Sequence, residues 1–221
     1  MDSIGRPHLV SDVMTRAVVS VGQETGFRDV VVLMSQWKVS AVPVVAGDGR
    51  VVGVVSEADL LPKEEFRDAD PPRIEQLRRL QDLAKAGAVT AGDLMTAPAV
   101  TVHADATLAE AARVMAVRRV KRLPVVDAEG VLVGVVSRGD LLKVFLRPDE
   151  AIAQEVRHEV LDRLFGRDAA LLAVSVEEGV VTLSGRLADT AQVPIAARLV
   201  RAVEGVVDIR WALTGQTLLA D

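Results

Sequence analysis

Residues 120–142 read VKRLPVVDAEGVLVGVVSRGDLL, and residues 39–61 read VSAVPVVAGDGRVVGVVSEADLL. The two stretches share one register, with a constant spacing of 81 residues between matched positions. The matched pairs are Pro43 and Pro124, Gly53 and Gly134, Ser56 and Ser137, and Asp59 and Asp140. Met14-Thr15 and Met95-Thr96 keep the same spacing. One supersecondary unit therefore occurs twice, and we call these units the first and second copy.

Composition limits the protein class. The 221 residues are 50% hydrophobic but only 3% aromatic, so we expect a core of small aliphatic side chains. A net charge of −5, from 26 basic and 31 acidic residues, argues against broad nucleic-acid binding. The absence of cysteine excludes disulfides, thiolate metal sites and cysteine nucleophiles. Residues 1–8 lack an apolar signal core and no apolar run approaches the ~18 residues of a membrane span, which predicts a soluble, cytoplasmic chain.

Each copy is expected to fold as strand, helix, strand, strand, helix. In the first copy these are Val18–Val21, Phe27–Trp37, Val42–Val45, Val51–Val55 and a short helix from Glu57. In the second copy they are Ala99–Val102, Leu108–Val117, Leu123–Val126, Val131–Val136 and Gly139–Phe145. Because proline has no amide hydrogen, Pro43 is predicted at the start or edge of its strand.

Helical spacing gives further expectations. Val30, Val31, Leu33, Met34 and Trp37 predict one buried face on the first long helix. Residues 1–12 are expected to form a short arm. After Pro71-Pro72, an amphipathic helix ending near Gly87 is predicted to serve packing or dimer contact, from the spacing of Ile74, Leu77, Leu80, Leu83 and Ala84.

A different pattern follows Pro148. A helix marked by Ile152, Val156, Val160 and Leu164 ends at Gly166, and is followed by strands at 172–176 and 180–185, a helix at 190–203 and a strand at 206–213. This order, αββαβ, predicts a small α+β domain. Pro194 is acceptable only in the first turn of its helix. Residues 180–183 and Trp211 are expected to form the core, the alternative being an exposed apolar surface for a partner.

The duplicated unit resembles a pair of CBS domains, named for cystathionine β-synthase. The resemblance rests on Met-Thr, on a hydrophobic-Pro-Val-Val-Asp strand, and on the motifs GVVSEADL at 53–60 and GVVSRGDL at 134–141. The first copy departs from the second in having Ala46 in place of Asp127 and Gly26-Phe27 in place of Thr107-Leu108. The fold class implied is α/β (α+β), with two β-α-β-β-α repeats forming one module.

Residues 150–215 resemble a BON domain, through VSVEEGVVTLSG at 174–185 and VEGV at 203–206. The expected domain organisation is a first CBS repeat at 1–66, a helical linker at 67–90, a second CBS repeat at 91–147 and a BON-like domain at 148–221. The BON resemblance implies a protein or phospholipid partner for this last domain.

The motif Ser-x-x-Asp before each short helix has two readings. It is a capping box, in which Ser caps the first turn and the acid three residues later caps Ser in return. Alternatively, Asp59 and Asp140 accept hydrogen bonds from a ribose diol while Ser56, Ser137 and the helix amides face a phosphate. The CBS resemblance implies the second reading, and the two can coexist.

The resemblance also implies that each ligand cleft uses both copies. One cleft would combine Val19, Val39, Ser40 and Ala41 for adenine with Ser137 and Asp140 for ribose, and Arg122 for phosphate. The other would combine Val100, Val120, Lys121 and Arg122 with Ser56 and Asp59. Because Ala41 stands at the position equivalent to Arg122 and cannot bind phosphate, the Asp140 cleft is predicted to be the better nucleotide site.

Other polar residues have more than one possible role. The cluster Arg118-Arg119-x-Lys121-Arg122 is either a solvated surface or a phosphate site, with nucleic acid the third choice. His8, His103 and His158 show no metal-ligand spacing and are expected at the surface. No nucleophile or base accompanies Asp59 or Asp140, so no catalytic or metal site is predicted.

The leading hypothesis is a non-enzymatic sensor. The CBS pair would bind AMP, ATP or a related adenosyl ligand, and the BON-like domain would pass the change in packing to a partner. A homodimer is expected, because CBS pairs associate through their helical faces. The alternatives are a ligand-free structural scaffold that docks on a protein or membrane, and a regulatory subunit of a separate enzyme or transporter.

Overall fold

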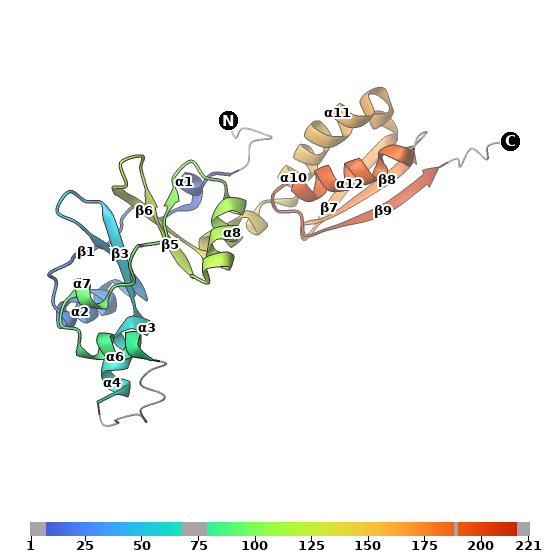
Figure 1. Cartoon of the computed structure of the whole chain (residues 1–221). Helices are drawn as coiled ribbons and strands as arrows, with labels where there is room; N and C mark the ends of the chain where they lie inside the picture. The colour runs from blue at the N-terminus through green and yellow to red at the C-terminus, as the bar shows by residue number, and fades with distance from the viewer. Residues whose placement is uncertain (1–7, 68–78, 188–189, 216–221) are drawn as a thin grey trace. The chain divides into compact units, whose positions relative to one another are not determined.

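The computed structural model describes residues 8–67, 79–187 and 190–215. These residues form two compact units. One unit spans Leu9–Arg138 and holds most of both copies; the other contains His8 and the described residues from Gly139 onward. Figure 1 shows the elements of each unit.

The first copy follows the expected order of strand, helix, strand, strand, helix. Its elements are β1 (Val21–Gly22), α2 (Phe27–Trp37), β2 (Ala41–Val45), β3 (Val51–Ser56) and α3 (Glu57–Leu60), followed by α4 (Pro62–Glu65). Two details differ from expectation. The first strand begins at Val21, not at Val18, and residues within the expected arm form a short helix, α1 (Val10–Val13).

The second copy repeats the same order. Its elements are α7 (Ala91–Leu94), β4 (Val102–His103), α8 (Leu108–Arg118), β5 (Arg122–Val126), β6 (Leu132–Ser137) and α9 (Arg138–Leu141), followed by the 3-10 helix η1 (Leu142–Leu146). The strand expected at Ala99–Val102 begins only at Val102. Helix α7 was not anticipated, and it matches α1 of the first copy at the spacing of 81 residues.

Each copy has a three-stranded sheet, in the orders β1-β2-β3 and β4-β5-β6. The first two strands are parallel and the last two antiparallel, with Pro43 opposite Val54 and Pro124 opposite Val135. The expectation that Pro43 lies at the start or edge of a strand is therefore wrong, because it is the third residue of the central strand. Strand β1 pairs only from Val44 onward, so no neighbouring strand faces the missing amide of Pro43 on that side.

The Met-Thr segments connect the two copies. Thr15 pairs with Val135 of the second copy, and Thr96 pairs with Val54 of the first. Each methionine consequently packs on the strand glycine of the other copy. A Cβ atom added at Gly53 would lie 2.8 Å from Met95 Cγ, and one added at Gly134 would lie 2.6 Å from Met14 Sδ. This contact explains why the motif has glycine at this position, since any larger residue would collide with the methionine.

The core of the first copy joins α2 to its sheet. Val30 and Met34 are buried against Val42, Val44 and Val55. The buried face of α2 is narrower than predicted, because Val31 is 40% exposed and Trp37 is 58% exposed. A sheet of three short strands is too small to cover both sides of the helical stripe.

Helix α6 (Leu80–Gly87) belongs to the segment between the copies. It ends at Gly87 as predicted, while Ile74 and Leu77 of the expected helix lie outside the described residues. None of its residues is buried, and Leu80 is 60% exposed. It contacts α3, α4 and α7, and α3 and α4 lie beside it in Figure 1. Lys63 of α4 donates to the Ala86 carbonyl at 2.9 Å.

The C-terminal unit has the expected order αββαβ. A long helical stretch comprises α10 (Asp149–Glu155), the π-helical segment η2 (Val156–Leu161) and α11 (Asp162–Phe165), followed by the 3-10 helix η3 (Gly166–Leu171). Strands β7 (Leu172–Glu177) and β8 (Val180–Leu187) are antiparallel, and β9 (Asp208–Gly215) pairs parallel to β8. The segment η4 (Thr190–Gln192) precedes α12 (Val193–Ala202), which places Pro194 in the first turn as predicted.

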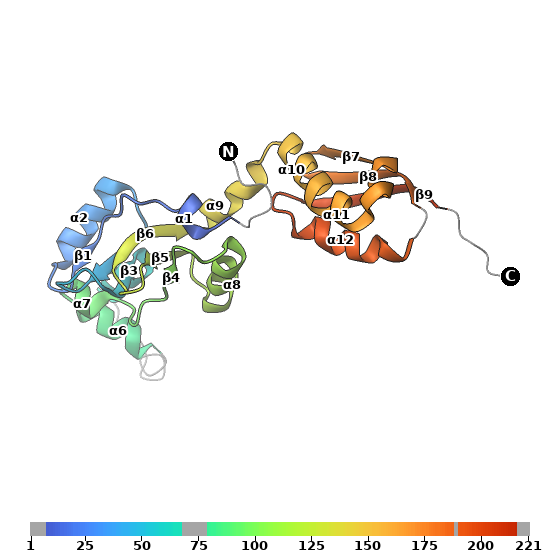
Figure 2. The same ribbon diagram turned by 90° about the horizontal axis from the view of Figure 1, so that it is seen from above.

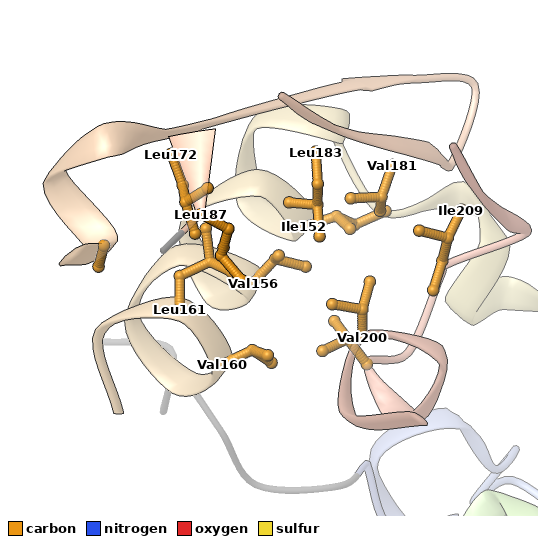
Figure 3. Packing of buried hydrophobic residues seen from close by; sticks show 12 residues of the cluster. Ile152, Val156, Val160, Leu161, Leu172, Val181, Leu183, Leu187, Val200 and Ile209 are labelled. Atoms are coloured by element: carbon orange, nitrogen blue, oxygen red, sulfur yellow. The ribbon is translucent and has the colours of Figure 1, made fainter. Parts of the chain in front are cut away.

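The helices of this unit pack on one face of its sheet (Figure 2). Figure 3 shows the buried side chains between them, with Ile152 and Val156 from the first helix facing Val181 and Leu183 from β8. Val200 of α12 completes this cluster, and Trp211 packs against it while partly exposed. Val181 and Leu183 thus form core as predicted, whereas Val180 and Thr182 of the predicted run are only partly buried.

A carboxylate fixes the turn between β7 and β8. Asp149 accepts hydrogen bonds from the backbone N–H groups of Glu178 and Gly179, at 2.8 and 2.9 Å. Both turn residues have positive φ, 49° and 74°. Across residues 8–67, 79–187 and 190–215, we find no helix with the length and apolar character needed to cross a bilayer.

Candidate functional site

A cavity of about 490 Å³ is lined by residues of both copies. Its size lies within the range of small-molecule sites, ~300–1,000 Å³. Six residues predicted for the Asp59 cleft line it, namely Ser56, Asp59, Val100, Val120, Lys121 and Arg122. Ser40 and Ala41, which the resemblance assigned to the other cleft, line it as well. We call this cavity the Asp59 pocket.

Strand register places Ser56 and Asp59 at the C-terminal end of β3. Ser56 ends β3 and lies opposite Ala41 of β2, and the Glu57 amide donates to the Ser40 carbonyl at 3.1 Å. The chain then turns into α3, whose first turn carries Asp59. The short helix therefore begins at the sheet edge, beside the loop that enters β2.

Asp59 is the only buried polar or charged residue in the described part of the chain, at 8% exposure. Its Oδ2 atom accepts hydrogen bonds from the Ser56 amide, at 2.7 Å, and from the Ser56 hydroxyl, at 2.6 Å. This contact is the return arm of the predicted capping box, which holds the carboxylate in a fixed orientation.

The second oxygen of Asp59 has partners that sequence reasoning missed. Lys85 of α6 forms an ion pair with Oδ1, and the Thr96 hydroxyl donates to the same atom at 3.2 Å. Lys85 also donates to Thr96 Oγ1 at 3.1 Å. Lys85 has no equivalent in the repeat, so neither spacing nor motif pointed to it, whereas Thr96 belongs to the Met-Thr pair that the repeat marks.

The pocket is also lined by cationic side chains. Helix α8 ends at Arg118, and Arg119 adopts the left-handed conformation with φ 56°, which turns the chain toward β5. Arg119, Lys121 and Arg122 all line the pocket. The acids on the lining are Glu57 and Asp59, and Lys85 already neutralises Asp59. The remaining charge favours an anionic ligand group, for which guanidinium and ammonium groups are suited.

Only some of the residues predicted for the Asp140 cleft lie in the same unit, because Asp140 itself belongs to the C-terminal unit. Val39 and Ser40 line a neighbouring open cavity of about 510 Å³, together with Arg122, and Val19 lines neither cavity. Ser137 ends β6 opposite Arg122. The assignment of Asp140 to a cleft with these residues stays a prediction. Because Arg122 lines the Asp59 pocket, the argument that this pocket lacks a phosphate-binding cation does not hold.

Asp140 lies in the C-terminal unit, where it pairs with Lys143 at 2.7 Å. This lysine is 55% exposed, whereas Lys85 beside Asp59 is 19% exposed. The position equivalent to Lys143 in the first copy is Pro62. The two copies thus provide their acids with lysine partners from different parts of the chain.

Two helix caps outside the pocket lower the pKa of the carboxylates that they hold. Hydrogen bonds from the Thr107 amide and hydroxyl lower the pKa of Glu110 at the start of α8. The Thr90 hydroxyl and amide lower the pKa of Asp93 in α7 in the same way. Both acids are therefore charged structural groups at neutral pH.

The histidines are dispersed among the described residues. His8 pairs with Glu204 through its ring and its amide, and His158 pairs with Asp162 at 3.1 Å. His103 is exposed. Within residues 8–67, 79–187 and 190–215, no three His, Asp or Glu side chains are grouped as metal ligands.

Comparison with known proteins identifies both parts of the chain. The CBS domain family matches residues 10–63 and 91–147, and the BON domain family matches residues 148–215. An uncharacterised protein of Methanocaldococcus jannaschii is 31% identical over 158 residues, which span 64% of this chain and 94% of that protein.

Two comparisons concern one plant protein. The chloroplastic CBS domain-containing protein CBSX2 of Arabidopsis thaliana is 32% identical over 155 residues, spanning 63% of this chain and 64% of its own length. A crystal structure of CBSX2 in complex with AMP superimposes with a TM-score of 0.56 over 63% of this chain and 97% of that chain. The identity in that superposition is 32%.

Proposed function

Because the chain belongs to the CBS-domain family, with two CBS domains followed by a BON domain, we propose that it is a non-enzymatic adenine-nucleotide sensor. The ligand is AMP, ATP or a related adenosyl compound, held in clefts between the copies. One observation carries the proposal: the buried carboxylate of Asp59 and three cationic side chains line the same pocket. The complex of the similar protein CBSX2 with AMP supports the same ligand class.

The expected binding mode follows from the groups in the pocket. Asp59 accepts the ribose hydroxyls, as a carboxylate held by a capping box is well oriented to do. Val100 and Val120 provide apolar contact for adenine, and Arg122 provides a bidentate donor for phosphate. No nucleophile is assigned to this site, so ligand binding changes packing and not covalent structure.

The test compares two acids in matching positions. Asp59→Asn is expected to lower the affinity for AMP roughly 10- to 100-fold, because hydrogen bonds to a charged group contribute ~1.5–3 kcal/mol. Asp93→Asn is the control, since Asp93 occupies the same capping position in α7 but lies outside the pocket. Isothermal titration calorimetry measures both, and equal affinities in the two variants would refute the site.

A scaffold without ligand is the second candidate. The ion pair of Asp59 with Lys85 favours it, because that pair leaves the buried carboxylate satisfied in an empty pocket. Thermal unfolding separates the two candidates, since a ligand that binds only the folded state raises the melting temperature. A shift with AMP, ADP or ATP supports the sensor; no shift with these or with S-adenosylmethionine supports the scaffold.

The BON domain is proposed to pass the ligand signal to a protein or phospholipid partner. Helix α12 supports this, because Ala196 and Val200 face the core while Ile195 and Leu199 are 49% and 36% exposed. Liposome co-sedimentation and pull-down of the full chain, each with and without AMP, test the two partner types. Binding that ignores AMP in both assays would refute the relay.

A homodimer is proposed through the helical faces of the CBS pair. Val31 and Trp37 of α2 and Val117 of α8 are exposed apolar residues that such contact would cover. Sedimentation equilibrium measures the oligomer, and the substitutions Trp37→Ser and Val117→Ser are expected to weaken it. A monomeric wild-type chain would refute this part of the proposal.

A further inference from the structure

The carboxylate of Asp59 has no acceptor capacity left. An ionised carboxylate offers about four lone-pair positions, two on each oxygen. The Ser56 amide and hydroxyl occupy Oδ2, while Lys85 and the Thr96 hydroxyl occupy Oδ1. A ribose diol that donates two hydrogen bonds to Asp59 must therefore displace donors that are already present.

Lys85 is the donor whose release matters most. The Ser56 contacts are part of the helix cap, and Thr96 is held by backbone pairing with Val54. Lys85 instead comes from α6, a helix with no buried residue. Apart from Lys85, α6 is fastened by Lys63 at the Ala86 carbonyl and, just before its start, by Arg79, which pairs with Glu65 of α4 and stacks on Phe66. Elements fastened by few, partly exposed contacts open most readily.

We infer that Lys85 is an internal competitor for the ribose site: its ammonium occupies Asp59 in the empty protein, and nucleotide binding expels it and loosens α6. This inference rests on the proposed function. It makes α6 the element that responds to the ligand at Asp59. The exchange is sterically local, because Lys85 contacts two residues that line the pocket, Asp59 and Thr96.

A competitor predicts a gain of affinity when it is removed. The apparent dissociation constant equals the intrinsic one divided by the fraction of protein that is free to bind. Lys85→Met, which keeps an unbranched side chain and removes the charge, is expected to tighten binding of both AMP and adenosine roughly tenfold. Lys85→Arg keeps the charge and can grip the carboxylate bidentately, so it is expected to weaken both.

The use of adenosine distinguishes competition from phosphate binding. If Lys85 served the phosphate, Lys85→Met would weaken AMP and leave adenosine unchanged, which would overturn the inference. Arg28→Met is the control for loss of a positive charge, because Arg28 is exposed and lines neither cavity. An effect of equal size in Arg28→Met would also overturn the inference.

Hydrogen exchange on wild-type protein gives a second measurement that needs no variant. AMP is expected to speed amide exchange in α6 and to slow it in α3, because the ligand replaces Lys85 at Asp59. Unchanged or slower exchange in α6 on AMP binding would overturn the inference alone. Failure of wild type and both Lys85 variants to bind either ligand would overturn the proposed function and this inference together.

Discussion

Substituting Gly53 by alanine tests the contact between the two copies. The added Cβ atom would lie 2.8 and 2.9 Å from Cγ and Cβ of Met95, whereas ordinary contacts of this kind lie at 3.4–4 Å. Met95 Sδ lies closer still, so the Met95 side chain must move within a close-packed interior, or β3 must shift. Overpacking of this kind costs ~1–3 kcal/mol, and relief of glycine's backbone entropy returns ~0.5–1 kcal/mol. We expect a net loss of about 1–2 kcal/mol in the free energy of unfolding.

The assay is urea denaturation followed by tryptophan fluorescence. The chain has two tryptophans, Trp37 in the CBS unit and Trp211 in the C-terminal unit. Replacing Trp211 by phenylalanine leaves Trp37 as the reporter of the unit that holds Gly53. Gly47→Ala is the matched control, because no atom lies within 4 Å of a Cβ added there.

A double substitution checks the cause of the loss. Met95→Ala removes Sδ and Cγ, the two atoms nearest to the added Cβ, so the cost of Gly53→Ala is expected to shrink in that background, with a coupling energy of roughly 1 kcal/mol. If Gly53→Ala is as stable as Gly47→Ala, or if the two changes are additive, the packing argument is wrong.

Three further outcomes are expected. Asp140→Ala should lower AMP affinity more than Asp59→Ala, because the lysine paired with Asp140 is 55% exposed and competes less than a largely buried one; titration calorimetry measures both losses. Above pH 4.5, Glu110→Gln should be less stable than wild type, because the Glu110 carboxylate stabilises the helix cap only while it is ionised. This difference in stability should shrink as the pH falls through the lowered pKa of Glu110. Thermal unfolding across roughly pH 3–7, which brackets the ordinary carboxylate pKa values, measures it. Asp149→Ala should destabilise the C-terminal unit by ~1–3 kcal/mol, because two turn amides lose their acceptor; Trp211 fluorescence in urea reports it.

Each of these expectations has a result that contradicts it. Equal losses of AMP affinity at Asp59 and Asp140 would contradict the ranking of the two clefts. A constant gap between wild type and Glu110→Gln at every pH would show that the cap does not titrate. Glu150→Ala is the neighbour control for Asp149, since Glu150 is exposed on the same helix, and equal destabilisation by both would contradict the role of the turn.

Local pattern was sufficient where the structure is local or repeated. Helix α2 spans Phe27–Trp37 as its apolar spacing predicts, and the two hairpins follow from apolar runs separated by turn residues. Because matched positions are 81 residues apart, the elements predicted in one copy could be compared with those predicted in the other. Short elements that depend on tertiary context were missed, including α1 and α7, whose four residues give no periodicity.

The limits of sequence reasoning are clearest at Pro43 and Lys85. Pro43 was expected at a strand edge because the rule treats strands as fully paired, whereas β1 is too short to reach that position. Lys85 is 26 residues from Asp59 and lies outside the repeat, so only the docking of α6 brings the two charges together. The outward position of Trp37 likewise depends on how little surface a three-stranded sheet offers.

The exchange of methionines between the copies has a consequence for any attempt to divide the protein. A single copy retains its strand glycine but lacks the methionine of the other copy that packs on it. Its own methionine, in turn, has no glycine to pack against. Two identical copies can restore both contacts, because each places its methionine on the glycine of the other, whereas one copy alone cannot. An isolated repeat is therefore expected to exist as an obligate pair, and the tandem arrangement in one chain is that pair made permanent by a covalent link.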